Sequence, residues 1–374
     1  MKRAATIVTA GVAVLWACGV AAGAQSAANR APLAEDVFTN IRLLRGLPID
    51  QFMGTMGVFS AATGLNCSDC HVEESGASWA RYADDNALKQ TTRRMMQMVD
   101  GLNKANFGGR QVITCYTCHR GFRRPAVMPS IDLLYGSPPP EEPGDFITPA
   151  RGGQASVDDI FTRYLEGLGG AERVTALRSF TGKGTYMGFD DAATSPMEMY
   201  AEAPARRAII GHSPAGDLTW VYDGRTGWLA APLTDRPLPV MPVTGQELEG
   251  LGVEAQVHFP AGLRQTLTNW RVGYAVEIGD REANVVQGTT RGGGVVTLCF
   301  DRETGLLIRL VRYANSPVGR IVTRVDYDDY REVAGVKMPF RWTVSWLNGR
   351  SVFELESVQP NVAINAARFV RPAR

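Results

Sequence analysis

The chain has 374 residues, of which 45% are apolar and 21% are charged, and its formal net charge is +1. This composition excludes a disordered chain, and the near-neutral charge excludes a generic nucleic-acid-binding surface. The length predicts two globular domains behind a leader, each long enough to bury its own core.

Residues 1–24 are typical of a secretory signal peptide. Lys2 and Arg3 give a positive start, an apolar stretch follows, and Ala22 to Ala24 offer a small-residue cleavage site. The apolar stretch is marginal as a membrane span, so an uncleaved anchor is the less favoured alternative. The residues ending at Cys18 also resemble a bacterial lipoprotein box, which leaves a membrane tether through Cys18 as another alternative. We therefore expect an exported protein that is periplasmic or membrane-associated.

Two copies of the C-x-x-C-H motif follow, and this spacing is that of c-type haem attachment. The expected haem thioether residues are Cys67, Cys70, Cys115 and Cys118, and the expected proximal iron ligands are His71 and His119. A structural zinc site is the alternative for two C-x-x-C pairs, but zinc does not explain a histidine after each pair. We therefore expect two covalently bound haem c groups.

The distal iron ligands have to come mostly from methionine. Beyond the two motif histidines the chain has only His212 and His258, and both lie in its second half. Methionine also suits electron-transfer haems because its thioether raises the reduction potential. Helical spacing predicts one helix up to Gly64, before the first motif, and another over about 86–106, before the second. The candidates on these helices are Met53 and Met56, then Met95, Met96 and Met98, and the residues alone leave the choice open.

The segment from about Val37 to Arg124 resembles the photosynthetic reaction-centre cytochrome c subunit family. The likeness rests on Gly64-Leu65-Asn66, on the run from Thr92 to Met98, and on the run from Val112 to Gly121. In that family each methionine-ligated haem takes its methionine from a helix before the attachment motif. The resemblance therefore implies Met56 and Met95 as the distal ligands. The best-known members carry four haems and this chain has two motifs, so the redox partner could be a membrane reaction centre or a respiratory complex.

Arginines near the motifs are candidates for pairing with haem propionates, which they bind through charge-assisted hydrogen bonds. These residues are Arg93, Arg94, Arg120, Arg123 and Arg124. Exposed arginines are mostly only solvated, so each is one candidate among several.

Two other classes of function stay open. A dihaem peroxidase would need one iron with an open or displaceable distal position, and the methionines upstream of both motifs argue against it. A haem-containing module that binds or senses a hydrophobic ligand is the other alternative. We expect an electron carrier rather than an enzyme, with redox proteins as donor and acceptor and no nucleic-acid partner.

The sequence predicts a multidomain α + β fold. We expect a mostly helical dihaem cytochrome domain over 31–130, a Pro/Gly-rich linker over 131–154, and an antiparallel β domain over 155–374. Strand-like runs recur in the last segment between turn signals such as Asp223-Gly224 and Asn348-Gly349, after a leading helix at Ser156. This pattern predicts a partly open, barrel-like sheet.

The second half also resembles the lipoprotein-carrier and sorting half-barrels. The likeness rests on its helix-then-strands order and on the run from Phe300 to Leu307, and it implies a lipid or protein ligand for the β domain. Cys299 is expected to be a buried small apolar residue of a strand. Because a linker separates the halves, we expect the β domain to be dispensable for haem attachment and for electron transfer in solution.

Overall fold

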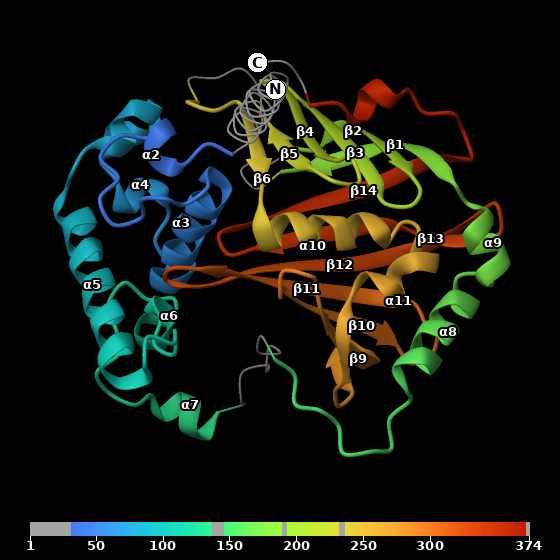
Figure 1. Cartoon of the computed structure of the whole chain (residues 1–374), viewed down its shortest axis with the longest axis horizontal. Coiled ribbons are helices and arrows are strands. Elements are labelled where there is room, and N and C mark those ends of the chain that lie inside the picture. The colour runs from blue at the N-terminus through green and yellow to red at the C-terminus, as the bar shows by residue number, and fades with distance from the viewer. Residues whose placement is uncertain (1–30, 137–145, 189–192, 232–235, 372–374) are drawn as a thin grey trace, which may run out of the picture.

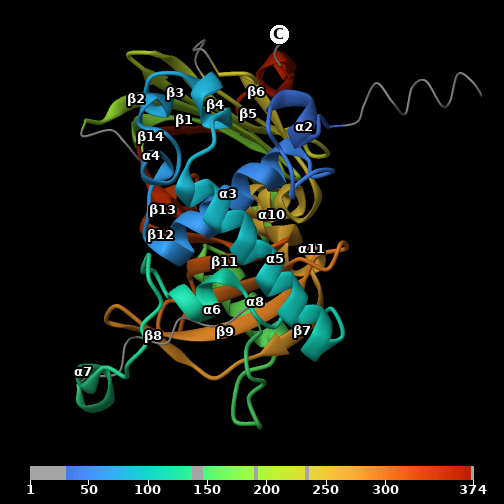
Figure 2. The ribbon, with the colours of Figure 1, turned by 90° about the vertical axis from the view of Figure 1, so that its left-hand side faces the viewer.

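The computed structural model describes residues 31–136, 146–188, 193–231 and 236–371. The predicted signal peptide, Cys18 and the centre of the predicted linker lie outside these residues. We name two regions of the described chain: the helical part, residues 31–136, and the β part, residues 146–371. Figure 1 shows the helical part beside one large sheet, and Figure 2 shows α3, α5 and α6 in front of that sheet.

The helical part contains the two long helices that the sequence predicts. Its elements are α2 (Ala34–Val37), α3 (Ile49–Thr63), α4 (Cys67–Cys70), η1 (Glu73–Gly76), η2 (Trp79–Ala83), α5 (Ala87–Phe107), α6 (Cys115–His119) and α7 (Ile131–Tyr135). The long helices α3 and α5 end at Gly64 (φ 69°) and Gly108 (φ 60°), because glycine takes the left-handed conformation without a steric cost. Among the described helices, none combines the length and the apolarity needed to span a bilayer.

The β part is built on one antiparallel sheet. Its strands are β1 (Ser179–Met187), β2 (Ser195–Glu202), β3 (Arg206–Ser213), β4 (Gly216–Tyr222), β5 (Gly227–Ala230), β6 (Val240–Val243), β7 (Thr268–Val272), β8 (Val276–Ile278), β9 (Arg281–Thr289), β10 (Val295–Asp301), β11 (Leu307–Ser316), β12 (Gly319–Val333), β13 (Val336–Trp346) and β14 (Gly349–Pro360). The strand order is β6-β5-β4-β3-β2-β1-β14-β13-β12-β11-β10-β9-β7, and β8 pairs with β9. The edge strands β6 and β7 are not neighbours, so the described sheet is not closed.

Helices pack on this sheet and form its core. They are α8 (Val157–Gly167), α9 (Ala171–Ala176), α10 (Gly245–Gln256) and α11 (Leu263–Thr266), with short turns η3 (Pro260–Gly262) and η4 (Ala366–Phe369). One apolar cluster joins Tyr164 of α8, Val253 of α10 and Leu263 of α11 to strand residues such as Phe300. The predicted fold class is confirmed: a helical part is followed by an unclosed antiparallel sheet with a leading helix.

A small cavity lies within the core of the β part. The cavity beside His258, which Tyr164 and Met338 also line, has about 10 Å³ of free volume, and that is close to the least a single water needs. Cys299 is fully buried in β10, as predicted, and burial raises the pKa of its thiol to about 12.

Candidate haem sites

The first motif forms a helical turn directly after α3. Asn66 caps α4: its Oδ1 accepts from the Asp69 backbone N–H at 2.9 Å, and Asp69 Oδ2 accepts from the Asn66 N–H at 2.9 Å. This reciprocal cap fixes one turn of helix, so the Cys67 and Cys70 thiols, three residues apart, lie on the same side. His71 follows as the residue that ends the turn.

The imidazole of His71 is held in the tautomer that binds metal through Nε2. Its Nδ1 lies 3.1 Å from the backbone oxygen of Tyr82. A carbonyl oxygen only accepts, so Nδ1 carries the proton and the lone pair of Nε2 is left for a ligand. Burial and the nearby Lys89 ammonium lower the pKa of His71, which favours the neutral ring that iron requires.

The second motif repeats this arrangement with different residues. Thr114 caps α6 through its hydroxyl and that of Thr117, which places Cys115 and Cys118 one turn apart. Nδ1 of His119 lies 3.0 Å from the backbone oxygen of Phe122, so Nε2 again keeps its lone pair. The chain reaches that position because Arg120 (φ 50°) and Gly121 (φ 87°) both adopt the left-handed conformation.

Helices α3 and α5 hold both motifs in one unit. Asn86, the N-cap of α5, donates from Nδ2 to the Cys70 carbonyl at 3.0 Å. Near the other end of α5, the buried Asn103 accepts from the N–H groups of Val112 and Ile113 through Oδ1 and donates to the Ile113 carbonyl at 2.8 Å. These bonds fix the segment that enters the second motif.

The end of α3 also contacts the end of the second motif. The Gly121 N–H donates to the Ala62 carbonyl at 2.9 Å. A Cβ on Gly64 would collide with the Gly121 carbonyl oxygen, so this approach requires glycine. The charge of Arg123 reaches Cys70 of the first motif, where burial nevertheless raises the pKa of the thiol.

The candidate distal methionines differ in their surroundings. Met53 and Met56 are half-buried on α3, and Met95 is half-buried on α5. Met96 packs with Val58, Ile321 and Cys115 in a cluster between the helical part and the β part, whereas Met98 is 45% exposed. The assignment of Met56 and Met95 as iron ligands stays a prediction. The packing of Met96 in this cluster gives that methionine a structural role without iron.

Apolar side chains around the motifs fit the faces of a porphyrin. Those that lie on the protein surface are Met98, Leu102, Val112, Tyr116 and Phe122. Of all the residues of α5, only Asn103 is fully buried, although the helix carries an apolar stripe. A porphyrin ring has two large apolar faces that need this kind of cover, so the residues present fit two haem groups.

The arginine candidates divide into two groups. Arg93 is committed to Asp85 at 2.7 Å, and Arg94 donates to the Thr91 hydroxyl at 2.9 Å. The side chains with neither an ion pair nor a hydrogen bond among the described residues are Arg120, Arg123 and Arg124, and all three are exposed. The last group is the better candidate for haem propionates.

The zinc alternative receives no geometric support. Among the described residues, no three His, Cys, Asp or Glu side chains come together as a site for a bare metal ion. His212 pairs with Asp217 at 2.8 Å, and His258 lies in the core of the β part beside Phe180 and Trp342. The contacts of both remaining histidines are therefore with residues of the β part.

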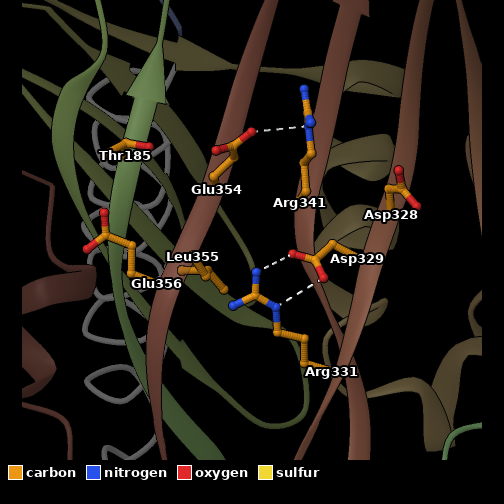
Figure 3. Close-up of a pocket in the computed structure, with 8 residues that line it drawn as sticks. All are labelled: Thr185, Asp328, Asp329, Arg331, Arg341, Glu354, Leu355 and Glu356. Carbon is orange, nitrogen blue, oxygen red and sulfur yellow. Dashed lines mark hydrogen bonds and ion pairs between the residues drawn. The ribbon is translucent and has the colours of Figure 1, made fainter.

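A surface pocket of about 530 Å³ opens on the β part. Figure 3 shows two ion pairs among its charged side chains: Arg331 with Asp329 at 2.5 Å and Arg341 with Glu354 at 3.2 Å. Asp328 lies nine residues along β12 from Gly319, which is about 30 Å at the usual strand rise, so this pocket is remote from the haem motifs.

Similar solved structures align over a little more than half of this chain. A DUF1329 family protein from Desulfovibrio piger aligns over 58% of this chain and 98% of its own, with 11% identity and a TM-score of 0.41. A putative outer membrane lipoprotein-sorting protein domain from Vibrio parahaemolyticus aligns over 56% and 97%, with 10% identity and a TM-score of 0.38. At these TM-scores neither alignment bears on function.

Similar sequences match about a quarter to a third of this chain. The Thermochromatium tepidum photosynthetic reaction center cytochrome c subunit is 35% identical over 26% of this chain and 24% of its own length. The Rubrivivax gelatinosus subunit is 30% identical over 32% of this chain and 31% of its own. The chain thus spans about a quarter to a third of the curated relatives it matches. The model of the family "Photosynthetic reaction centre cytochrome C subunit" matches residues 14–132, so the helical part is similar to that family, as the sequence predicts.

Proposed function

We propose that the protein is an exported dihaem c-type cytochrome that transfers electrons outside the cytoplasm. The observation that carries this proposal is the paired histidine geometry: His71 and His119 each follow a C-x-x-C turn and commit Nδ1 to a backbone carbonyl, which leaves the lone pair of Nε2 for a ligand. The similarity of residues 14–132 to a cytochrome family supports the same conclusion.

Each motif would hold one haem by the same division of roles. The thiols of Cys67 and Cys70, and those of Cys115 and Cys118, would form the thioether links. His71 and His119 would bind iron on the proximal side, with Met56 and Met95 on the distal side. The bound haem supplies an iron that accepts and releases one electron between Fe(III) and Fe(II).

The residues around the iron ligands would keep this exchange reversible. Carbonyl oxygens of Tyr82 and Phe122 fix the orientation of the two imidazoles, so the ligand set need not rearrange when the charge of the site changes. A ligand set with a methionine on each distal side leaves no open position for a substrate. This is why electron transfer is favoured over peroxidase activity.

The partners in this role would be an electron donor and an electron acceptor. A reaction centre or a respiratory complex in the membrane suits an exported cytochrome whose N-terminal residues read as a signal peptide or a lipoprotein box. The β part would serve location or partner choice because it supplies no expected iron ligand: His212 pairs with Asp217, and His258 lies in the core beside Trp342.

The test is a haem count on protein from a host with a cytochrome c maturation system. We expect two haems per chain by pyridine haemochrome, retention of the haem on a denaturing gel, and reversible reduction without turnover of hydrogen peroxide. Tightly bound zinc without covalent haem would contradict the proposal, and rapid peroxide turnover would favour the enzyme instead.

A further inference from the structure

The hairpin of β11 and β12 extends from the sheet to the second motif. Figure 1 shows this orange hairpin ending between α3 and α6. The Cys115 N–H donates to the Val318 carbonyl at 3.4 Å, and Gln111 Nε2 donates to the Ser316 carbonyl at 2.9 Å. The segment that enters the second motif is therefore bonded to the β part at two points, once through its backbone and once through a side chain.

Apolar contacts reinforce these two hydrogen bonds. Val58 of α3 and Ala314, Val318 and Ile321 of the hairpin form a buried cluster, and Cys115 packs against it. A Cβ on Gly54 would come within 2.5 Å of Ile321 Cδ1, so α3 lies directly on β12. Burial of this kind stabilises the contact beyond its hydrogen bonds.

The turn itself is fixed by a buried hydroxyl. Ser316 is 8% exposed, and its Oγ donates to the Gly319 carbonyl at 2.8 Å and accepts from the Val318 N–H at 3.3 Å. The Val318 carbonyl is thereby presented in one orientation. The first motif has a different support, because its bonds to Tyr82 and Asn86 come from within the helical part.

We propose that the β11–β12 hairpin belongs to the second haem site: it positions the Cys115 end of the motif, and with it the haem bound to His119. This inference rests on the proposed function. It assigns Ser316, Val318 and Gln111 as positioning residues for one haem only. The second motif is then bonded directly to the sheet, whereas the bonds at the first motif, to Tyr82 and Asn86, lie within the helical part.

The test uses the full, haem-loaded chain with Ser316→Ala and Gln111→Ala. The matched control is Thr304→Ala, because the Thr304 hydroxyl closes the β10–β11 turn in the same way, by a 2.9 Å bond to Asp301. Amide exchange read by mass spectrometry on peptides spanning 112–120 should rise about fivefold in both hairpin variants, the factor that one ordinary hydrogen bond is worth. The control should leave these peptides unchanged.

The midpoint potentials give a second readout. A redox titration of two haems has two components, and the component that moves in Met95→Ala identifies the second haem. We expect that component alone to shift in Ser316→Ala and Gln111→Ala, with the first unchanged. Equal shifts of both components, or unchanged exchange and potentials, would overturn the inference.

The outcomes separate this inference from the function on which it rests. Wild-type protein without covalent haem contradicts the proposed function, whereas haem-loaded protein with indifferent hairpin variants contradicts only the role of the hairpin. If Ser316→Ala does not accumulate as folded protein, Gln111→Ala decides, because its side chain belongs to the helical part and lies outside the sheet core.

Discussion

The helical part and the β part bury their apolar side chains in different ways. In residues 31–136 the buried apolar side chains are Ala34, Leu44, Ile49, Val58 and Ala62, and Val58 owes its burial to the sheet. Within the β part, a large cluster joins the helices to many of the strands, and smaller clusters lie elsewhere on the sheet. A domain with so small a core of its own needs a cofactor or a partner surface, and the helical part has candidates for both.

Removing a haem should break this comparison most strongly. We expect the double variant Cys67→Ala/Cys70→Ala to lower the haem count from two to one per chain. In a chain that has lost both haems, we expect the amides of residues 31–136 to exchange rapidly while those of β1 and β14 stay protected. Mass spectrometry of exchanged peptides would measure this. Cys299→Ala is the control, since it removes a buried cysteine of the sheet and no haem. Full protection of α5 in a haem-free chain would contradict the expectation.

Acid should weaken the β part through His258. Burial, with the nearby Arg207 charge, lowers the pKa of His258 from 6.5 to about 3. Between these values the unfolded chain binds a proton that the folded chain does not, so the free energy of unfolding falls as pH falls, by about 1.4 kcal/mol per pH unit. Urea unfolding at pH 4 to 7 measures the slope. His258→Phe should flatten this slope, because it removes the buried imidazole.

Much of the site and sheet could be predicted because their signals are local. The two C-x-x-C-H motifs, the helix ends at Gly64 and Gly108, and the alternating strands are written within a few residues each. The carbonyls of Tyr82 and Phe122 could not be predicted in the same way. Every residue has a carbonyl, and which one meets an imidazole depends on loop conformations such as that of Arg120.

The missed elements have physical reasons. Helix α10 contains Gly250 and Gly252, which suggest a loop, but a Cβ at these positions would collide with Arg312 and Tyr222. Strand β6 contains Pro242, which a sheet tolerates because β6 is an edge. The Pro-rich linker predicted separable halves, whereas the bond from Cys115 to Val318 joins residues 203 positions apart (318 − 115), and no local pattern signals such a contact.

Substitution of the two predicted distal methionines should distinguish the two haems of the helical part. Met56→Ala and Met95→Ala should each lower the potential of one haem by on the order of 0.1 V, a fraction of the roughly 0.8 V range that axial ligands span. Spectroelectrochemical titration would measure the two components. Met96→Ala is the matched control, because Met96 packs in the cluster between the helical part and the β part. A larger shift in Met96→Ala than in Met95→Ala would reverse the assignment.

The smallest expected effect concerns the contact at the start of α3. Asp50 is buried, and its carboxylate accepts from the Thr244 N–H at 2.7 Å and from the Thr244 hydroxyl at 2.8 Å, where Thr244 is the N-cap of α10. Asp50→Ala should lower the free energy of unfolding by about 1–3 kcal/mol, because it leaves the partly buried N–H of Thr244 without its acceptor. Urea unfolding measures the loss, and exchange of the first amides of α10 locates it.

The raised pKa of Asp50 predicts how its contribution to stability changes with pH. Burial raises it above 3.8, against the hydrogen bonds from Thr244 that lower it. The folded chain therefore holds the proton to higher pH than the unfolded chain does, and stability from this group is greatest at low pH and declines as pH rises through the folded pKa. Asp50→Asn resembles the protonated acid, so at neutral pH it should cost less than Asp50→Ala. The control is Ser156→Ala, which removes the cap of α8 and should leave exchange of the α10 amides unchanged. If Ser156→Ala raises exchange of the α10 amides as much as Asp50→Ala does, then Asp50 does not specifically hold α3 to α10.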